Sequence, residues 1–568
     1  MLDRPATDGV DRRARVGDHS HVMKHSAVTI AAVLALAGSL GAQASRSDVQ
    51  PRSPFERGLR VEITVPASVR SEPVTGRVYF IVARSGDREP RLQIGRTGTP
   101  LFGRDVEKLA PGQAAVIDAT DLGTPLSSLK DLPEGDYVVQ AFVNLYSEFA
   151  RADGHTVWMH DDQWEGQHWN VAPGNLYSQP QTIRIDAATE RIRLAADQVI
   201  APVEVAADTD FVKRFKIQSA LLTKFWGRPI YVGATVLLPR DYATSTVKYP
   251  ILYRQGHFSL AAPLGFEEGS DLYRAWLRDD FPRMLVVTLQ HPTPYFDDSY
   301  GVNSVNVGPY GDAIMQELIP EVERRFRAIG EPWARIIDGG STGGWISLAH
   351  QIFYPDFYGG VWSYCPDSVT FTDMEGINVY SDENAFHRTI DWRTVPIINT
   401  REVNGHVRLT SEQRNHMELV NGTKGRSGHQ LDIWSAVFGP LGTDGYFEPL
   451  FDKRTGAINR QVAEYWRDHY DLLEYLKRNW SAVGPKLVDK IHVYTGTMDN
   501  FFLNNSTKEL EQWMKTTENP HYEGFFLYGD GKGHCWQGPE AIQERLTQMA
   551  VHIARHKPEG MTTPWWQY

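Results

Sequence analysis

A serine between glycines is the first feature of the sequence that could do chemistry. Ser341 lies in the stretch Gly339-Gly340-Ser341-Thr342-Gly343-Gly344, which contains the pattern G-x-S-x-G. Glycines two residues before and after a serine leave room for a very tight turn, on which the serine oxygen stands clear. The apolar segment 335–337 precedes the turn and an apolar segment follows it, which predicts strand, turn and helix. Ser341 is therefore a candidate nucleophile, with a chance match to a common pattern as the alternative.

A serine becomes a useful nucleophile only when a base removes its proton and an acid orients that base. Asp499 follows the apolar segment 491–495, and His534 lies in a glycine-rich loop after the segment 524–528. Catalytic groups gather at the carboxyl ends of strands in open α/β sheets. In folds that contain this serine turn, the catalytic residues follow one another along the chain in the order serine, acid, histidine. We predict Asp499 as the acid and His534 as the base. Asp367, which follows an earlier strand, is the alternative acid.

The negative charge that develops in acyl transfer needs backbone N–H donors. The amide of Thr342, at the start of the predicted helix, is one candidate. A second donor is expected from the loop after an early strand, here 254–258 after 251–253. We predict the amide of His257 or Phe258.

The chain has two cysteines, and both fall near this chemistry. Cys365 follows the strand after the predicted nucleophile helix, and Cys535 is next to His534. We expect a disulfide that fixes the loop of the base, because an exported chain meets oxidising conditions. The alternative is two unpaired buried thiols.

The elements that would position these residues alternate between apolar runs and helical patterns. Buried strands alternating with amphipathic helices favour a mostly parallel sheet covered on both faces. One helix is expected over 311–329, and a long helical insert over about 369–488 is interpreted as a lid. We assign residues 229–560 to this α/β domain. The expected strands cover 230–238, 251–253, 284–289, 335–337, 360–364, 491–495 and 524–528.

Short strands separated by Gly, Pro and Asp clusters precede the α/β part. This pattern is typical of an all-β sandwich-like domain, which we place at 59–186, with a connector at 187–228. Its loop 155–169 holds three Trp and three His. Packing against the α/β domain, a stacking surface for a sugar, and a metal site are the three interpretations of this loop.

The first 44 residues resemble an export signal. Lys24 and His25 precede the apolar run 27–40, and Ala42-Gln43-Ala44 forms a cleavage pattern, so residues 1–44 are interpreted as a signal peptide with an N-terminal extension. An uncleaved membrane anchor is the alternative, although the run is short for a bilayer. We expect a secreted or periplasmic protein without stable membrane insertion. The net charge of −12 argues against nucleic acid as a partner.

Longer stretches carry a family resemblance. Residues 302–314, the elbow GGSTGGW, the stretch YPDFYGGVWSYCPD (354–367) and GKGHCW resemble the esterase family that includes esterase D and enterochelin-esterase-like proteins. The resemblance covers roughly residues 210–555. It implies an α/β-hydrolase fold, hydrolysis of carboxylic esters, and Ser341, Asp499 and His534 as the triad. The loop QGHF (255–258), in place of the family's usual His-Gly pair, and the long insert depart from the family pattern.

These features predict a serine esterase that acts through an acyl-enzyme, with no metal or organic cofactor. Its substrate would be a small-molecule or polysaccharide-linked ester. A peptidase or acyltransferase on the same fold is the first alternative. A catalytically inactive binding or surface protein is the second.

Overall fold

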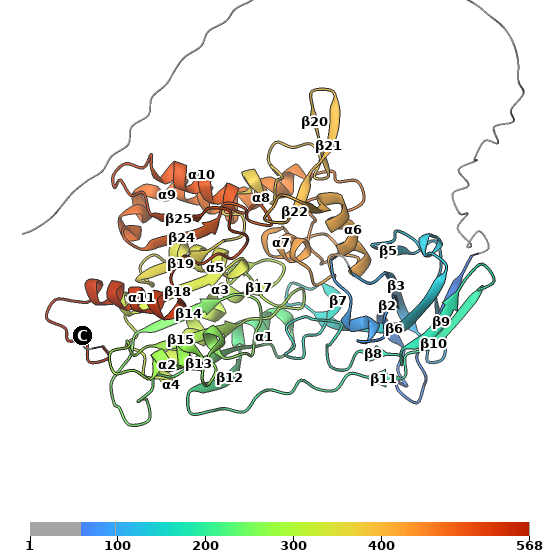
Figure 1. Ribbon diagram of the computed structural model, residues 1–568, viewed down its shortest axis with the longest axis horizontal. Coiled ribbons are helices and arrows are strands. Elements are labelled where there is room, and N and C mark those ends of the chain that lie inside the picture. The colour runs from blue at the N-terminus through green and yellow to red at the C-terminus, as the bar shows by residue number, and fades with distance from the viewer. Residues whose placement is uncertain (1–57, 97, 567–568) are drawn as a thin grey trace, which may run out of the picture. The chain divides into compact units, whose positions relative to one another are not determined.

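A mixed sheet of eight strands organises the second half of the chain (Figure 1). The computed structural model describes residues 58–96 and 98–566; the predicted signal peptide at 1–44 lies outside them. From β15 to β25 neighbouring strands are parallel, whereas β13 pairs antiparallel with both β12 and β15. In spatial order the strands are β12 (Val212–Gln218), β13 (Tyr231–Leu237), β15 (Leu285–Gln290), β14 (Ile251–Gln255), β18 (Arg335–Gly340), β19 (Gly360–Tyr364), β24 (Ile491–Gly496) and β25 (Phe525–Gly529).

Helices join and cover these strands. The central helix α5 (Thr342–Phe353) packs against β14, β18 and β19, and all but the last of its residues are buried. The helix predicted at 311–329 is divided into α3 (Tyr310–Ala313), a π-helical turn at Ile314–Leu318, and α4 (Ile319–Arg325). It ends before Phe326, whose φ of −116° and ψ of 26° leave the helical region. The other helices of this part are α1 (Ala220–Trp226), α2 (Asp271–Trp276), α10 (Asn504–Met514) and α11 (Ile542–His556).

The segment between β19 and β24 contains helices and small hairpins. The last part of this segment forms α8 (Arg460–His469) and α9 (Leu472–Leu487), separated where the Asp471 side chain caps α9. The hairpin β20–β21 projects outward (Figure 1), and Trp392 in its turn is 94% exposed. The remaining elements are α6 (Ser411–Asn421), α7 (Gln430–Phe438), β20 (His387–Ile390), β21 (Arg393–Pro396), β22 (Ile398–Arg401) and β23 (Val407–Thr410).

Two sheets that share one apolar core form the first part of the described chain. One sheet has the order β10-β1-β4, and the other β11-β8-β6-β2-β3-β5, with β7 and β9 also paired to β6. The strands are β1 (Arg60–Thr64), β2 (Val74–Ala83), β3 (Leu101–Leu109), β4 (Ala114–Ile117), β5 (Leu122–Thr124), β6 (Gly135–Ala150), β7 (Thr156–His160), β8 (Leu176–Tyr177), β9 (Gln181–Ile185), β10 (Arg191–Ala195) and β11 (Gln198–Val199).

The segment 187–228, which we expect to be a connector, partly helical or extended, contains strands and a helix. Its first part forms β10, which pairs in parallel with β1, and β11, which pairs with β8. Its second part forms β12 and α1, and β12 is the edge strand of the eight-stranded sheet. Three sheets therefore extend into this segment, and its residues Ile192 and Leu194 belong to the apolar core of the first two.

Buried polar contacts join the first part to the segment after β19. Arg77 on β2 is 2% exposed, and its Nε donates to the carbonyl of Val420 over 2.9 Å. Tyr79, on the same face, donates to the carbonyl of Asn421. Both acceptors belong to the last turn of α6, whose carbonyls have no partner within the helix. The two parts thus satisfy each other's buried polar groups.

Within residues 58–96 and 98–566, no helix combines the length and the apolar character that a membrane crossing needs.

Candidate active site

Ser341 occupies a strained turn between β18 and α5. Its φ is 58° and its ψ is −123°, a conformation that non-glycine residues rarely adopt. Two glycines after the serine have no room for a side chain. A Cβ on Gly343 would lie 2.0 Å from the carbonyl oxygen of Gln255, and a Cβ on Gly344 would lie 2.6 Å from the carbonyl oxygen of Tyr364. The turn therefore presents the serine at the carboxyl end of the sheet, as the motif predicts.

A chain of hydrogen bonds joins Ser341 to His534 and Asp499. Nε2 of His534 lies 2.9 Å from Oγ of Ser341, and its Nδ1 lies 2.7 Å from Oδ2 of Asp499. Asp499 is fully buried, and its Oδ1 accepts from the amides of Phe501 and Leu503. A carboxylate only accepts hydrogen bonds, so the proton of a neutral His534 lies on Nδ1. Nε2 is then free to accept the proton of the serine.

The surroundings of His534 change its proton affinity. Burial lowers its pKa, but the hydrogen bond to Asp499 and the nearby sulfur of Cys535 act in the opposite direction and prevail, so the pKa is raised. The ring of Phe501 packs edge-on against the imidazole, with 4.9 Å between centroids. His534 is thus a strongly basic group held in one orientation.

The segments that carry the predicted oxyanion donors adjoin this turn. Thr342 is the first residue of α5, where amides have no acceptor within the helix. The carbonyl of Gln255 and the Cα of Gly256 lie next to Gly343, so the loop that carries His257 and Phe258 runs past the elbow.

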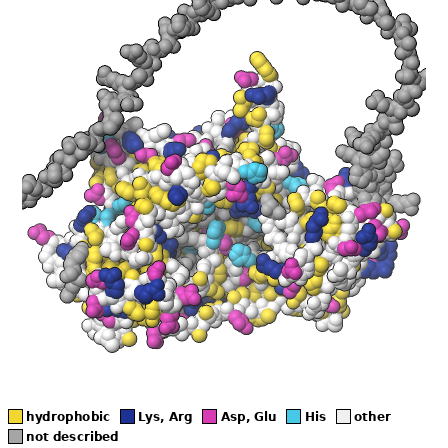
Figure 2. All heavy atoms as spheres, viewed as in Figure 1, with side chains coloured by type: hydrophobic (Ala, Val, Ile, Leu, Met, Phe, Trp, Pro, Cys, Tyr) yellow, Lys and Arg dark blue, Asp and Glu magenta, His cyan; other side chains and the backbone are white. Residues whose placement is uncertain are grey.

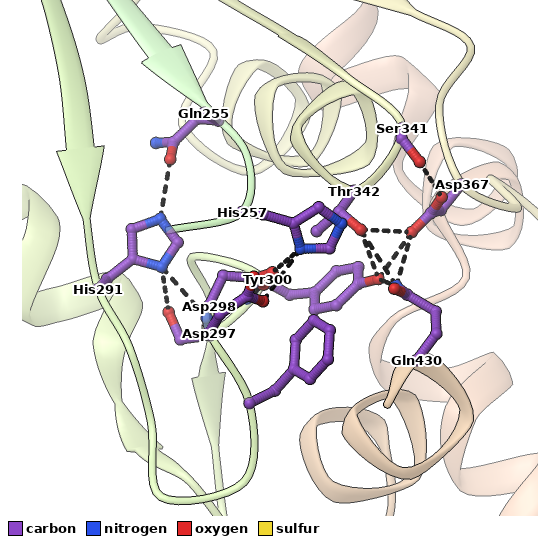
Figure 3. Close-up of polar contacts among 12 residues, drawn as sticks. Gln255, His257, His291, Asp297, Asp298, Tyr300, Ser341, Thr342, Asp367 and Gln430 are labelled. Carbon is purple, nitrogen blue, oxygen red and sulfur yellow. Dashed lines mark hydrogen bonds and ion pairs between the residues drawn. The ribbon is translucent and has the colours of Figure 1, made fainter. Parts of the chain in front are cut away.

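The side chain of His257 adds positive charge near this position (Figure 3). Its Nδ1 lies 3.0 Å from Oδ1 of Asp297 and 3.2 Å from Oδ2 of Asp298. The side chain of His257 is 45% exposed; partial desolvation lowers its pKa, but the two buried carboxylates outweigh this and hold the pKa well above its usual value. Sequence reasoning considered only the amide of this residue; neither Asp297 nor Asp298 belongs to a motif that could have revealed the pair.

Asp367, the alternative acid, contacts Ser341 (Figure 3). Its Oδ1 lies 3.3 Å from Oγ of Ser341, and its Oδ2 accepts from the hydroxyls of Tyr300 (2.6 Å) and Thr342 (3.0 Å) and from Nε2 of Gln430 (3.2 Å). Burial raises the pKa of Asp367, and the hydrogen bond from Tyr300 and the charges of His534 and His257 offset part of this rise. Tyr300 and Gln430 carried no signal in the sequence, because tertiary packing alone brings them here.

The two cysteines lie together beside His534. Their sulfur atoms are 2.7 Å apart, and both are free thiols in the structure. Both residues have positive φ, 40° for Cys365 and 59° for Cys535. The predicted proximity is present, while the disulfide itself stays a prediction.

The Trp-rich loop 155–169 packs against the α/β part. The ring of Trp164 lies edge-on to that of Phe258 at 5.1 Å, and Gln167 donates to the carbonyl of Pro294. Trp169 stacks on Tyr79 of β2 at 4.4 Å. These contacts favour the packing interpretation, which places the loop next to the predicted oxyanion segment.

Two groups of described residues have side chains close enough to hold a metal ion. They are Cys365 with His534 and Cys535, and His257 with Asp297 and Asp298. In each group the imidazole already has close partners: Ser341 and Asp499 for His534, and the two carboxylates for His257. These contacts explain both groups without an ion.

Comparisons with known proteins give structural neighbours. No family model and no curated protein matches the chain. Similar solved structures include a ferulic acid esterase (18% identity, 61% of this chain and 99% of that chain, TM-score 0.37) and an S-formylglutathione hydrolase from Agrobacterium tumefaciens (13%, 62% and 97%, TM-score 0.32). A prolyl endopeptidase is similar over 81% of this chain and 49% of its own, at 12% identity and a TM-score of 0.32.

Proposed function

We propose that the protein is a serine esterase of the α/β-hydrolase type that hydrolyses carboxylic esters through an acyl-enzyme. One observation carries the proposal: Ser341, His534 and Asp499 form a continuous chain of contacts of 2.9 and 2.7 Å. A nucleophile, a base within reach of its proton and a buried acid that orients the base are the parts that acyl transfer requires.

The proposed reaction has two halves. Nε2 of His534 takes the proton of Ser341 while Oγ attacks the ester carbonyl, and the resulting oxyanion is bound by the amides of Thr342 and of His257 or Phe258. His534 then gives its proton to the departing alcohol, which leaves the acyl group on Oγ. Water, deprotonated by His534, attacks the acyl carbon and releases the carboxylic acid.

The setting of this chemistry is also proposed. The segment 369–488 would act as a lid, and the sandwich-like first domain would flank the mouth of the site. We propose that the protein is exported and acts on a small or polysaccharide-linked ester. On the face shown in Figure 2 basic side chains are interspersed with acidic ones, which supports a partner other than nucleic acid.

The proposal is tested by hydrolysis of p-nitrophenyl acetate with the purified protein and with its Ser341→Ala variant. We expect release of p-nitrophenol that is abolished in the variant, and labelling of the parent protein alone by a fluorophosphonate. Equal hydrolysis by both proteins would rule out Ser341 as the nucleophile. An inert parent protein that also resists the fluorophosphonate would refute the proposed activity.

A peptidase and an acyltransferase remain alternatives on the same fold, because they share the acylation half and differ in the bond cleaved or in the acceptor. Parallel assays with peptide p-nitroanilides and with added alcohols measure both.

A further inference from the structure

One oxygen of Asp367 faces the nucleophile with unused capacity to accept hydrogen bonds. Oδ2 receives three donors, from Tyr300, Thr342 and Gln430. Within residues 58–96 and 98–566, the one donor near Oδ1 is the hydroxyl of Ser341, at 3.3 Å. A carboxylate oxygen can accept two hydrogen bonds, so Oδ1 has room for a further donor.

The hydroxyl of Ser341 has a single proton, so it cannot donate to Oδ1 while it donates to Nε2 of His534. When Ser341 attacks an ester, that proton moves to His534 and the serine oxygen becomes bonded to the acyl carbon, so Oδ1 has no donor from Ser341 during the reaction. Asp367 is 4% exposed, and a buried acceptor without a donor carries a free-energy penalty. A substrate that supplies a new donor to Oδ1 would remove the penalty in the transition state and in the acyl-enzyme.

The position of Oδ1 indicates where that donor belongs on the substrate. The leaving alcohol must lie next to His534, which protonates it, whereas Asp367 is bonded to Thr342 and Tyr300. Asp367 therefore borders the acyl side of the site. A hydroxyl or amino group on the α-carbon of the acyl chain is three bonds from Oγ of Ser341, and so can reach an oxygen adjacent to Oγ.

Asp367 is also held too firmly to turn away from the substrate. Its Oδ2 is bonded to groups from three places in the chain: Tyr300 in the loop after β15, Thr342 at the start of α5, and Gln430 at the start of α7. The nitrogen atoms of Gln430 and of Trp434 also contact the Tyr300 hydroxyl. An acceptor that is held in place before the substrate binds is selective, because binding then requires little further loss of side-chain conformational freedom.

We propose that Asp367 is a specificity-determining residue that accepts a hydrogen bond from the α-substituent of the acyl group, so that the preferred substrates are esters of α-hydroxy or α-amino acids. The inference rests on the proposed esterase function and narrows its substrate class. Both substituents share the chemistry of a donor on the α-carbon, and the assay separates them.

The test compares ethyl lactate and ethyl alaninate with ethyl propionate, which lacks the α-donor. Each kcat/KM is divided by the rate of hydroxide-catalysed hydrolysis of the same ester, which removes differences in intrinsic reactivity. We expect the normalised value for at least one α-substituted ester to exceed that for propionate by about tenfold or more, the effect of one hydrogen bond to a charged group. The higher of the two identifies the substituent as hydroxyl or ammonium.

The Asp367→Asn variant tests the residue itself. The three donors at the Oδ2 position will hold the amide oxygen there, so the amide nitrogen turns toward Ser341 and donates instead of accepting. We expect the ratio of α-substituted to unsubstituted ester to fall to about one in this variant. Because both esters are measured with the same variant, the ratio of their kcat/KM values is unaffected by a general loss of activity that comes from disturbing Thr342. Asp356→Asn, an exposed carboxylate that pairs with Lys486, is the matched control and should keep the parent ratio.

The outcomes separate this inference from the proposed function. Ser341-dependent hydrolysis of all esters with a ratio near one in the parent protein would overturn the role of Asp367 and leave the esterase intact. A high ratio that survives Asp367→Asn would likewise overturn it. If no ester is hydrolysed in a Ser341-dependent manner, the proposed function itself fails. The parent ratio alone decides the matter if the variant does not fold.

Discussion

At the scale of single residues, two buried carboxylates lie at the candidate site and make different contacts. Asp499 is bonded to Nδ1 of His534, and Asp367 lies against Ser341. The first contact fixes the tautomer of the base and stabilises its charged form, so it should matter for every substrate. The second should matter for substrates that carry the matching donor.

Replacing Asp499 by Asn should lower kcat for p-nitrophenyl acetate by about 10²- to 10⁴-fold, because the base loses its orientation and the partner of its charge. Steady-state kinetics measure the loss. Asp530→Asn is the matched control: this exposed carboxylate is four residues from His534 in sequence and should leave kcat unchanged. An equal loss in both variants would count against Asp499 as the acid.

The raised pKa of His534 gives a pH dependence with a definite sign. Only neutral His534 can accept the serine proton, so kcat/KM should fall as the pH falls through the pKa of this residue. Because the pKa is raised, the midpoint should lie above the value of about 6.5 for an unperturbed histidine. A profile of kcat/KM against pH measures it. A midpoint below 6 would contradict the geometry.

The thiols next to His534 give a separate prediction. If Cys365 and Cys535 are joined under oxidising conditions, titration of the denatured, unreduced protein should find no free thiol, and titration after reduction should find two. A Cys365→Ser variant is the control and should show one free thiol in both states. Two free thiols without reductant would contradict the disulfide.

At the scale of secondary structure, the turn from β18 to α5 depends on glycines that backbone crowds from several sides. A methyl group on Gly343 would lie 2.0 Å from the carbonyl oxygen of Gln255, so the loop after β14 would have to move. Gly343→Ala should therefore lower the free energy of unfolding by about 1–3 kcal/mol, the usual effect of overpacking. It should also reduce activity, because the same loop carries His257.

Gly86→Ala is the matched control for that variant. A Cβ at this position meets only the side chain of Val138, at 3.5 Å, an ordinary contact distance. Urea unfolding followed by circular dichroism compares the two. Similar stability in both variants would mean that the loop after β14 yields readily, and would weaken the argument for a fixed oxyanion position.

Strong local hydrophobic patterns made most strands of the α/β core predictable from the sequence. Some strands at sheet edges have weak patterns and were not predicted. The apolar runs at 251–253, 335–337 and 360–364 became β14, β18 and β19 because burial on both faces demands continuous apolar sequence. Edge strand β12 reads VKRFKIQ, with three basic residues, and so lacks that signal. In β10 only Ile192 and Leu194 face the core, which is too little to mark a strand.

The residues of the candidate site also differ in how far the sequence reveals them. Ser341 and His534 belong to local motifs and could be found in the sequence. The residues around Asp367 come from segments far apart, with Tyr300 and Gln430 separated by 130 positions. Their meeting depends on how the segment after β19 packs, which no local pattern records.

At the scale of the whole molecule, the described residues belong to one compact unit in which the first sheets and the later helices share buried polar groups. The guanidinium of Arg77 contacts Asp105 and the carbonyls of Gly103 and Val420. Arg77→Ala should lower the free energy of unfolding by about 2–4 kcal/mol, because it leaves the buried carbonyls of Gly103 and Val420 without this donor and takes one of two arginine partners from Asp105.

The control is Arg193→Ala. The Arg193 side chain is 70% exposed and pairs with Glu62 at the surface, so its loss should cost less than about 1 kcal/mol. Urea unfolding should show one transition in the parent protein and in both variants. A small effect of Arg77→Ala, or a separate early transition for the first sheets, would show that the shared contacts carry little stability.

The bond from Arg77 to Val420 spans 343 positions of the chain, and this has a consequence for protein engineering and for biosynthesis. A fragment that stops after the first sheets would lose the α6 carbonyls that accept from Arg77 and Tyr79 and would expose this face of β2 to water, so the region is a poor choice for transplantation or for expression alone. During synthesis the same face stays uncovered until α6 has emerged from the ribosome. His534 emerges later still, so a nascent chain has Ser341 long before the base that we propose activates it.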